Sequence, residues 1–138
     1  MAARPTRPTL SGQRIALLLL FAVPACLGSH DASALQASFS WHGIAACERV
    51  SPGFSVKDAP PGTKRLRFTL HDEQAPHFHH GGSSVAYSGQ KIPQGAIHYI
   101  GPCPPSGRTH HYVWTIEALD GKGHVLGKTS AGASFPMK

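Results

Sequence analysis

A strict alternation of polar and apolar side chains runs through residues 65–70. Leu66, Phe68 and Leu70 are apolar, and the arginines and threonine between them are polar. Side chains on a β-strand point alternately to opposite faces, so this pattern is typical of a strand with one buried face. The segment predicts a strand over residues 65–70 that packs its apolar face against a core.

Similar short apolar segments recur along the chain, separated by turn residues. Fifteen glycines and twelve prolines interrupt the sequence, and no long segment has a helical period. The further segments predicted as strands are residues 39–41, 53–56, 85–87, 96–100, 110–119, 124–126 and 133–135. Many short strands and no helices predict a mainly β single domain, a β-sandwich or barrel-like sheet, over residues 35–138.

A loop rich in glycine and proline precedes the most aromatic of these segments. Residues 101–107 contain three prolines and two glycines, and His110 and His111 follow at the start of the strand 110–119. The loop cannot be helical, because proline lacks an amide donor and glycine disfavours helix. Adjacent strand residues face opposite ways, so one of the two histidines can face a cavity while the other faces away.

The first 34 residues have the features of a secretory signal peptide. Three arginines precede an apolar run over residues 15–23, which is too short for a permanent membrane span. Cleavage is predicted after Ala25, at a lipobox-like sequence that would leave Cys26 to be lipidated, or after Ala34. The protein is then periplasmic or secreted, and attached to a membrane only if Cys26 carries a lipid.

Export also affects how the cysteines and the charge are interpreted. Without Cys26, the remaining thiols are Cys47 and Cys103, and an oxidising compartment favours a disulfide between them. Two free buried thiols are the alternative. The formal charge of +6 includes three arginines before Cys26, and no basic run or stripe follows, so nucleic acid is not predicted as a partner.

The polar residues with useful chemistry gather at predicted strand ends and turns: Asp72, His79, His80, Tyr87, His110 and His111. If the strand ends meet, a carboxylate and imidazoles converge beside the glycine/proline loop and form a small site for an oxyanion. A strand-end Asp is, alternatively, an ordinary turn cap. Ten histidines make a metal-binding protein the rival function, although HExxH and zinc-finger spacings are missing from the sequence. A hydrolase is less favoured, because no G-x-S-x-G motif is present.

An ordered set of short motifs resembles the phosphatidylethanolamine-binding protein family, also called Raf kinase inhibitor-like proteins. The motifs are Ser-Pro-x-Phe at residues 51–54, Pro-Gly-Thr-Lys at 61–64, Asp-x-x-Ala-Pro at 72–76, Ile-Pro-x-Gly at 92–95, and the loop 101–107 running into His-x-Tyr at 110–112. The resemblance covers about residues 39–120. It implies a short, exported, bacterial-type member of the family, which lacks the C-terminal helices.

The resemblance also implies a non-catalytic pocket for a small anionic or phosphorylated ligand, such as a phospholipid head group, and no cofactor. The family's pocket residues fall on Asp72, on His80 with His79 as the alternative, on Gly101 and Pro102, and on His110; Tyr87 is added as a lining residue. Two departures stand out. The family's second Asp is Gln74 here, and its His-Arg-Tyr motif has His111 in place of arginine.

Overall fold

The computed structural model describes residues 1–2 and 34–138. The predicted signal peptide and both of its cleavage sites therefore lie outside the described residues or at their border. The chain divides into two units, residues 1–30 and 31–138, and the fold below is that of the second unit. Within the described residues, no helix is long and apolar enough to cross a membrane.

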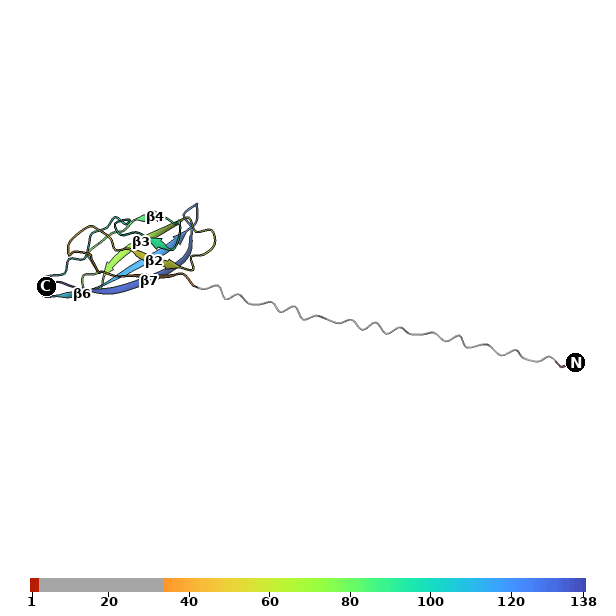
Figure 1. Ribbon diagram of the computed structural model, residues 1–138. Helices are drawn as coiled ribbons and strands as arrows, with labels where there is room; N and C mark the ends of the chain where they lie inside the picture. The colour runs from red at the N-terminus through yellow and green to blue at the C-terminus, as the bar shows by residue number, and fades with distance from the viewer. Residues whose placement is uncertain (3–33) are drawn as a thin grey trace. The chain divides into compact units, whose positions relative to one another are not determined.

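Two antiparallel sheets make up the domain (Figure 1). The larger sheet has the order β4-β3-β6-β7 and contains β3 (Arg65–Asp72), β4 (Ser84–Ala86), β6 (Thr109–Leu119) and β7 (Val125–Pro136). The smaller sheet has the order β1-β2-β5 and contains β1 (Gln36–Phe39), β2 (Phe54–Lys57) and β5 (Lys91–Ile92). The prediction of a mainly β fold is confirmed.

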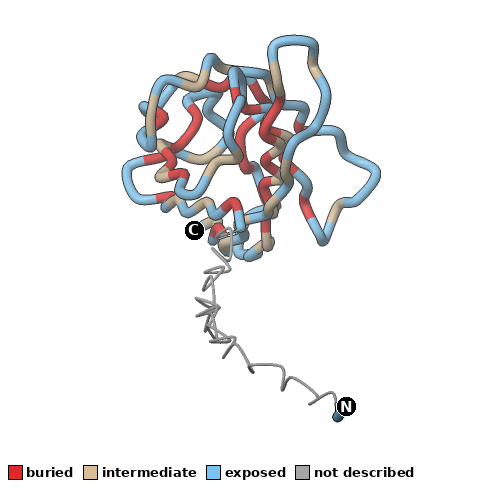
Figure 2. The backbone as a smooth tube through the Cα atoms, turned by 90° about the vertical axis from the view of Figure 1, so that its right-hand side faces the viewer, coloured by how far each residue is buried: buried red, intermediate tan, exposed pale blue. Residues whose placement is uncertain are grey.

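The core lies between the two sheets and is largely aromatic. In β3, Leu66, Phe68 and Leu70 are buried, as their alternation predicts. Phe54 of the smaller sheet packs against Phe68 and Trp114 of the larger one, with ring centroids 4.9 and 5.4 Å apart. Figure 2 shows buried segments gathered in the interior of the domain and exposed segments on the outer loops. Burying such side chains stabilises the fold by about 2 kcal/mol each.

Three predicted strand positions differ in the structure. The first strand ends at Phe39, and Trp41 lies just beyond it, where its Nε1 donates to the carbonyl of Ala133, 3.2 Å away. A two-residue strand, β5, lies within the segment expected to be only turns. The two returning segments after residue 123 form one continuous strand, β7, because it pairs with β6 along nearly its whole length.

The segment 96–100, predicted as a strand, is not one. Its backbone amides do not hydrogen-bond to a neighbouring strand. The Ile97 amide donates to Oγ of Ser51 at 3.1 Å, and the Ile100 amide donates to the carbonyl of His80 at 2.7 Å. The apolar side chains at 97 and 99 are buried, which explains the alternation, but side chains and single backbone groups satisfy the amides there. This irregular segment helps to build the site described next.

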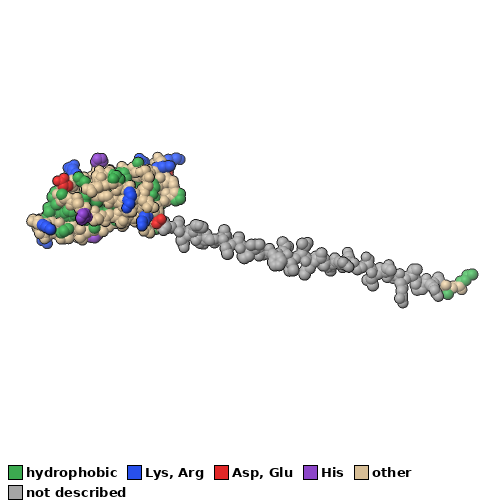
Figure 3. All heavy atoms as spheres, viewed as in Figure 1, with side chains coloured by type: hydrophobic (Ala, Val, Ile, Leu, Met, Phe, Trp, Pro, Cys, Tyr) green, Lys and Arg blue, Asp and Glu red, His purple; other side chains and the backbone are tan. Residues whose placement is uncertain are grey.

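Basic side chains do not form a stripe on the face drawn in Figure 3. Lys and Arg lie there in several separate places among apolar and uncharged polar side chains. This distribution agrees with the absence of a basic run in the sequence.

Candidate functional site

The pairing of β3 with β6 brings Asp72 and His110 together. Asp72, the last residue of β3, is opposite Tyr112 in the ladder, and His110 lies two residues earlier on β6. Because residues two apart on a strand share a face, Asp72, Tyr112 and His110 all point to the inner face at one end of the sheet. His111 points to the outer face, where its Nδ1 lies 3.2 Å from Oγ of Ser134.

The Asp72 carboxylate is buried and fully engaged in hydrogen bonds. Its side chain is 4% exposed, and its Oδ2 accepts a 2.7 Å hydrogen bond from Nδ1 of His110. Its Oδ1 accepts from the amides of Gln74 and Ala75, at 2.9 and 3.1 Å. Asp72 is thus a turn cap and a partner of an imidazole at once. Burial alone would raise its pKa, but the hydrogen bonds from His110 and Gln74 outweigh burial and lower the pKa.

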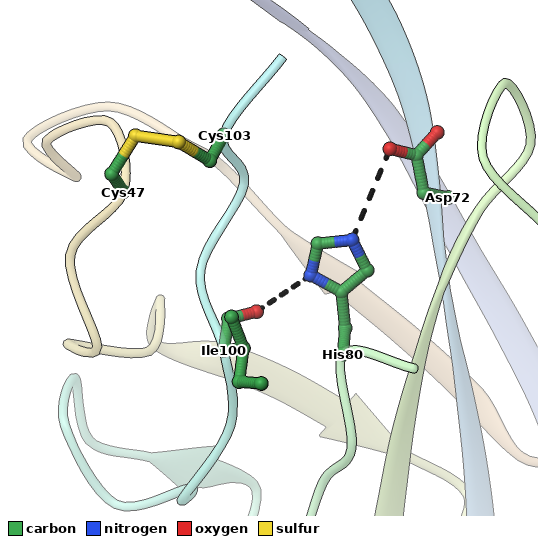
Figure 4. Close-up of a disulfide and its surroundings, with 5 residues drawn as sticks. All are labelled: Cys47, Asp72, His80, Ile100 and Cys103. Carbon is green, nitrogen blue, oxygen red and sulfur yellow. Dashed lines mark hydrogen bonds and ion pairs between the residues drawn. A yellow bond between two sulfur atoms is a disulfide. The ribbon is translucent and has the colours of Figure 1, made fainter. Parts of the chain in front are cut away.

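His80 approaches the same carboxylate from the loop that follows β3. Its Nδ1 donates to the carbonyl of Ile100 at 2.7 Å, and the Ile100 amide donates back to the carbonyl of His80. Its Nε2 lies 3.9 Å from Oδ2 of Asp72, and only 3% of the side chain is exposed. Figure 4 shows the ring of His80 held between Ile100 and Asp72 in this way.

The predicted disulfide is present and fastens the opposite wall of the site. Cys47 and Cys103 are bonded across 56 positions of sequence, beside the His80 ring in Figure 4. The Cys47 amide also donates to the carbonyl of Pro102 at 2.8 Å. Gly101 is required here by packing, because a Cβ on it would lie 1.8 Å from the carbonyl oxygen of Glu48.

A cavity of about 480 Å³ opens between these segments. Asp72, His80 and His110 supply its polar side chains, and Gly101 supplies backbone. The remaining wall is apolar or disulfide, and consists of Cys47, Ala75, Phe78, Ile100, Cys103 and Pro105. Phe78 and Ile100 are 51% and 40% exposed, so the polar groups lie within an apolar rim that reaches the surface.

A buried tyrosine hydroxyl lies next to this cavity. The hydroxyl of Tyr112 is inaccessible to solvent and has no hydrogen-bond partner of good geometry among the described residues. It lies beside the Asp72 carboxylate, and burial together with that negative charge raises the pKa of Tyr112.

Three residues predicted for the site do not line the cavity. His79 is exposed and precedes the inward-facing His80. Pro102 is fully buried and is not among the residues that line the cavity. The Tyr87 amide binds the carbonyl of Lys64, just before β3 begins, whereas Asp72 ends that strand. Eight residues of strand separate the two positions by roughly 25 Å, so Tyr87 belongs to the other end of the sheet.

Several lining residues are missed by sequence reasoning. Phe78 carried no signal because it lies between histidines in an irregular loop, and Ile100 belonged to a predicted strand. The disulfide had been predicted, but the sequence gives no indication that it faces the cavity. Within the described residues, no group of three or more His, Cys, Asp or Glu side chains could hold a metal ion.

Comparison with known proteins finds relatives of this fold and of part of the sequence. Residues 79–137, which include His80, Gly101 and His110, match the family model for phosphatidylethanolamine-binding protein. YbhB of Escherichia coli strain K12, a UPF0098 protein, is 28% identical over 97 residues; the match covers 53% of this chain and 61% of YbhB. Both matches support the resemblance to the phosphatidylethanolamine-binding protein family that the motifs indicated.

A solved structure supports this fold. The crystal structure of a putative phosphatidylethanolamine-binding protein homologue from Chlamydia trachomatis resembles the chain with a TM-score of 0.58 and 18% identity, over 76% of this chain and 99% of the other. Escherichia coli YbcL, described as a new member of the mammalian family, gives a TM-score of 0.45 at 17% identity, over 65% and 80%. The chain spans about three fifths of the length of YbhB.

Proposed function

We propose that the protein binds a small ligand with an oxyanion head group, such as a phosphoryl group, and does so without catalysing a reaction. The observation that carries the proposal is the convergence of Asp72, His80 and His110 at one cavity, from three separate segments of the chain. Buried ionisable side chains that share a cavity are characteristic of ligand sites.

The apolar rim determines what else the ligand carries. Phe78, Ile100 and the disulfide surround the polar floor, so a ligand with an apolar substituent next to its head group fits better than a free inorganic ion. A phosphorylated amphiphile, including a phospholipid head group, has this character. Inorganic phosphate and phosphoethanolamine then serve as minimal probes of the head-group site.

Export to an oxidising compartment is part of the same proposal. The Cys47–Cys103 bond supports it, because disulfides persist mainly outside the cytosol. Cell fractionation tests this: the processed protein should be found in the periplasm or the medium, and full-length protein in the cytosol would contradict it.

Histidine NMR tests the binding proposal. Adding phosphate or phosphoethanolamine should shift the imidazole signals of His80 and His110, and His110→Ala should abolish the response. His98, which is exposed and does not line the cavity, gives the matched control, since His98→Ala should leave the response intact. Unchanged imidazole signals at millimolar ligand would contradict the proposal.

A further inference from the structure

With neutral imidazoles, the polar side chains of the cavity can only accept hydrogen bonds. A carbonyl oxygen cannot donate, so the 2.7 Å contact to Ile100 places the hydrogen of His80 on Nδ1 and leaves its Nε2 bare. The 2.7 Å contact to Asp72 does the same for His110. Asp72 is ionised, because its pKa is lowered. The three side chains then carry one negative charge and offer no hydrogen.

An oxyanion has the same deficiency, because its oxygens also only accept. None of the residues lining the cavity in the described part of the chain is Lys or Arg. Placing an anion beside the buried Asp72 carboxylate would therefore oppose two like charges where water screens poorly, and would leave acceptors facing acceptors. While the imidazoles are neutral, no side chain of the described residues that line the cavity supplies a hydrogen to a fully ionised ligand.

We propose that the site takes up one proton when it binds its oxyanion, and that Nε2 of His80 carries this proton. The inference rests on the proposed function. Protonation at Nε2 keeps the Nδ1 bond to Ile100 intact and creates a donor next to the cavity. It also places a positive charge on the His80 ring, 3.9 Å from Oδ2 of Asp72. The negative charge of the Asp72 carboxylate offsets the cost of burying this positive charge.

The surroundings of His80 support this assignment. The titratable groups that face it are Asp72 on β3, and Tyr112 and His110 on β6. Its ring also packs edge-to-face against Tyr112, with ring centroids 5.3 Å apart, and against Phe78, with centroids 4.7 Å apart. The ring is thus immobilised at the cavity, whereas His110 is already bonded to Asp72 and is more exposed, at 14%.

Proton uptake makes the site a pH sensor. When one proton is bound with each ligand, ligand affinity falls as pH rises, by up to about tenfold per pH unit. A ligand captured in acidic surroundings would then be released near neutral pH.

Calorimetric titration of the purified protein with inorganic sulfate and phosphate, at pH 6, 7 and 8, tests the proposal. Each titration is run in two buffers of different ionisation enthalpy, which gives the number of protons taken up. Sulfate stays fully ionised over this range, so any proton must be carried by the protein. We expect uptake of about one proton and about tenfold weaker sulfate binding per pH unit towards pH 8.

Two variants assign the proton. His80→Gln retains a donor close to Nε2 but cannot titrate, so it should bind sulfate with no proton uptake and a flat pH profile. His98→Gln, outside the cavity, should behave like the wild type. If His80→Gln is unstable, the imidazole ¹⁵N signals of His80 in the wild type give the same information, since both nitrogens should become protonated when sulfate is added.

The outcomes separate this proposal from the proposed function. Sulfate binding that is equal at pH 6 and 8 without proton uptake would overturn the proton coupling and leave the anion site standing. Proton uptake seen with phosphate but not with sulfate would place the proton on the ligand. Proton uptake that persists in His80→Gln would place the proton on another group of the protein. Either result refutes the assignment to His80. Binding of neither anion at any pH would remove both proposals.

Discussion

Replacing both Cys47 and Cys103 with serine should lower the free energy of unfolding by about 4 kcal/mol. The bond joins residues 56 positions apart, and in the chain-entropy model closing a loop of this length costs the unfolded chain about 14 cal/mol/K, or roughly 4 kcal/mol at 25 °C. For a domain of about 105 residues, this is a large part of the ordinary stability of 5–15 kcal/mol.

Urea denaturation followed by tryptophan fluorescence measures this loss, since Trp41 and Trp114 are both buried. With a slope of about 1.5 kcal/mol per M, the midpoint should fall by roughly 3 M. Wild-type protein reduced with an excess of dithiol is the control, because it loses the bond without any substitution. A loss below about 1 kcal/mol in both samples would refute the reasoning that the bond acts on the unfolded chain.

Three further changes test individual contacts. Gly101→Ala should lower the free energy of unfolding in urea by about 3 kcal/mol, because the new Cβ would clash with the carbonyl of Glu48. Gly121→Ala is the control: its Cβ would meet only Lys64, at 4.0 Å, so it should change this free energy by less than about 1 kcal/mol. Equal effects of the two substitutions would contradict the packing account. Tyr112→Phe should cost less than about 1 kcal/mol in the same assay, because the lost hydroxyl has no well-formed hydrogen bond among the described residues, and a loss above 2 kcal/mol would reveal a strong bond to Asp72. Asp72 contributes stability in full above its unfolded pKa of about 3.9 and loses it as pH falls through its lower folded pKa. Asp72→Asn should therefore cost about 2 kcal/mol at pH 7, where it removes hydrogen bonds to a charged group, and should flatten the acid limb of thermal unfolding below about pH 5. An unchanged limb would contradict this.

The parts of the fold that depend on regular alternation could be predicted from the sequence. Leu66, Phe68 and Leu70 specify both the strand and its buried face, and the long strand β6 follows from its aromatic and β-branched residues. The adjacent histidines could be assigned to opposite faces because the strand period is two. The segment 96–100 misled this reasoning, since buried side chains alternate there without a partner strand.

The sequence placed the polar side chains and Gly101 at the site, but not the apolar side chains that form much of the cavity wall. Asp72 and His110 stand at strand ends, where topology can bring them together. His80 was one of several polar residues in the turns, and the motif resemblance favoured it over His79. Phe78 and Ile100 line the cavity because the loops that carry them are held by individual hydrogen bonds, such as that between His80 and the carbonyl of Ile100. No periodic pattern in the sequence predicts such hydrogen bonds. Tyr87 was assigned to the site because it follows the Gly81–Gly82 turn closely in sequence. The chain runs back along β3 after this turn, so Tyr87 lies beside Lys64 at the start of β3, whereas Asp72 lies at the end of β3.

The most direct test of the central claim is a crystal structure of the protein soaked in phosphate at pH 6. The account predicts an anion in the cavity within hydrogen-bonding distance of Nε2 of His80 and of the His110 ring, next to the Asp72 carboxylate and beside the Cys47–Cys103 wall. A cavity free of phosphate at saturating concentration, with the three side chains unchanged, would contradict it.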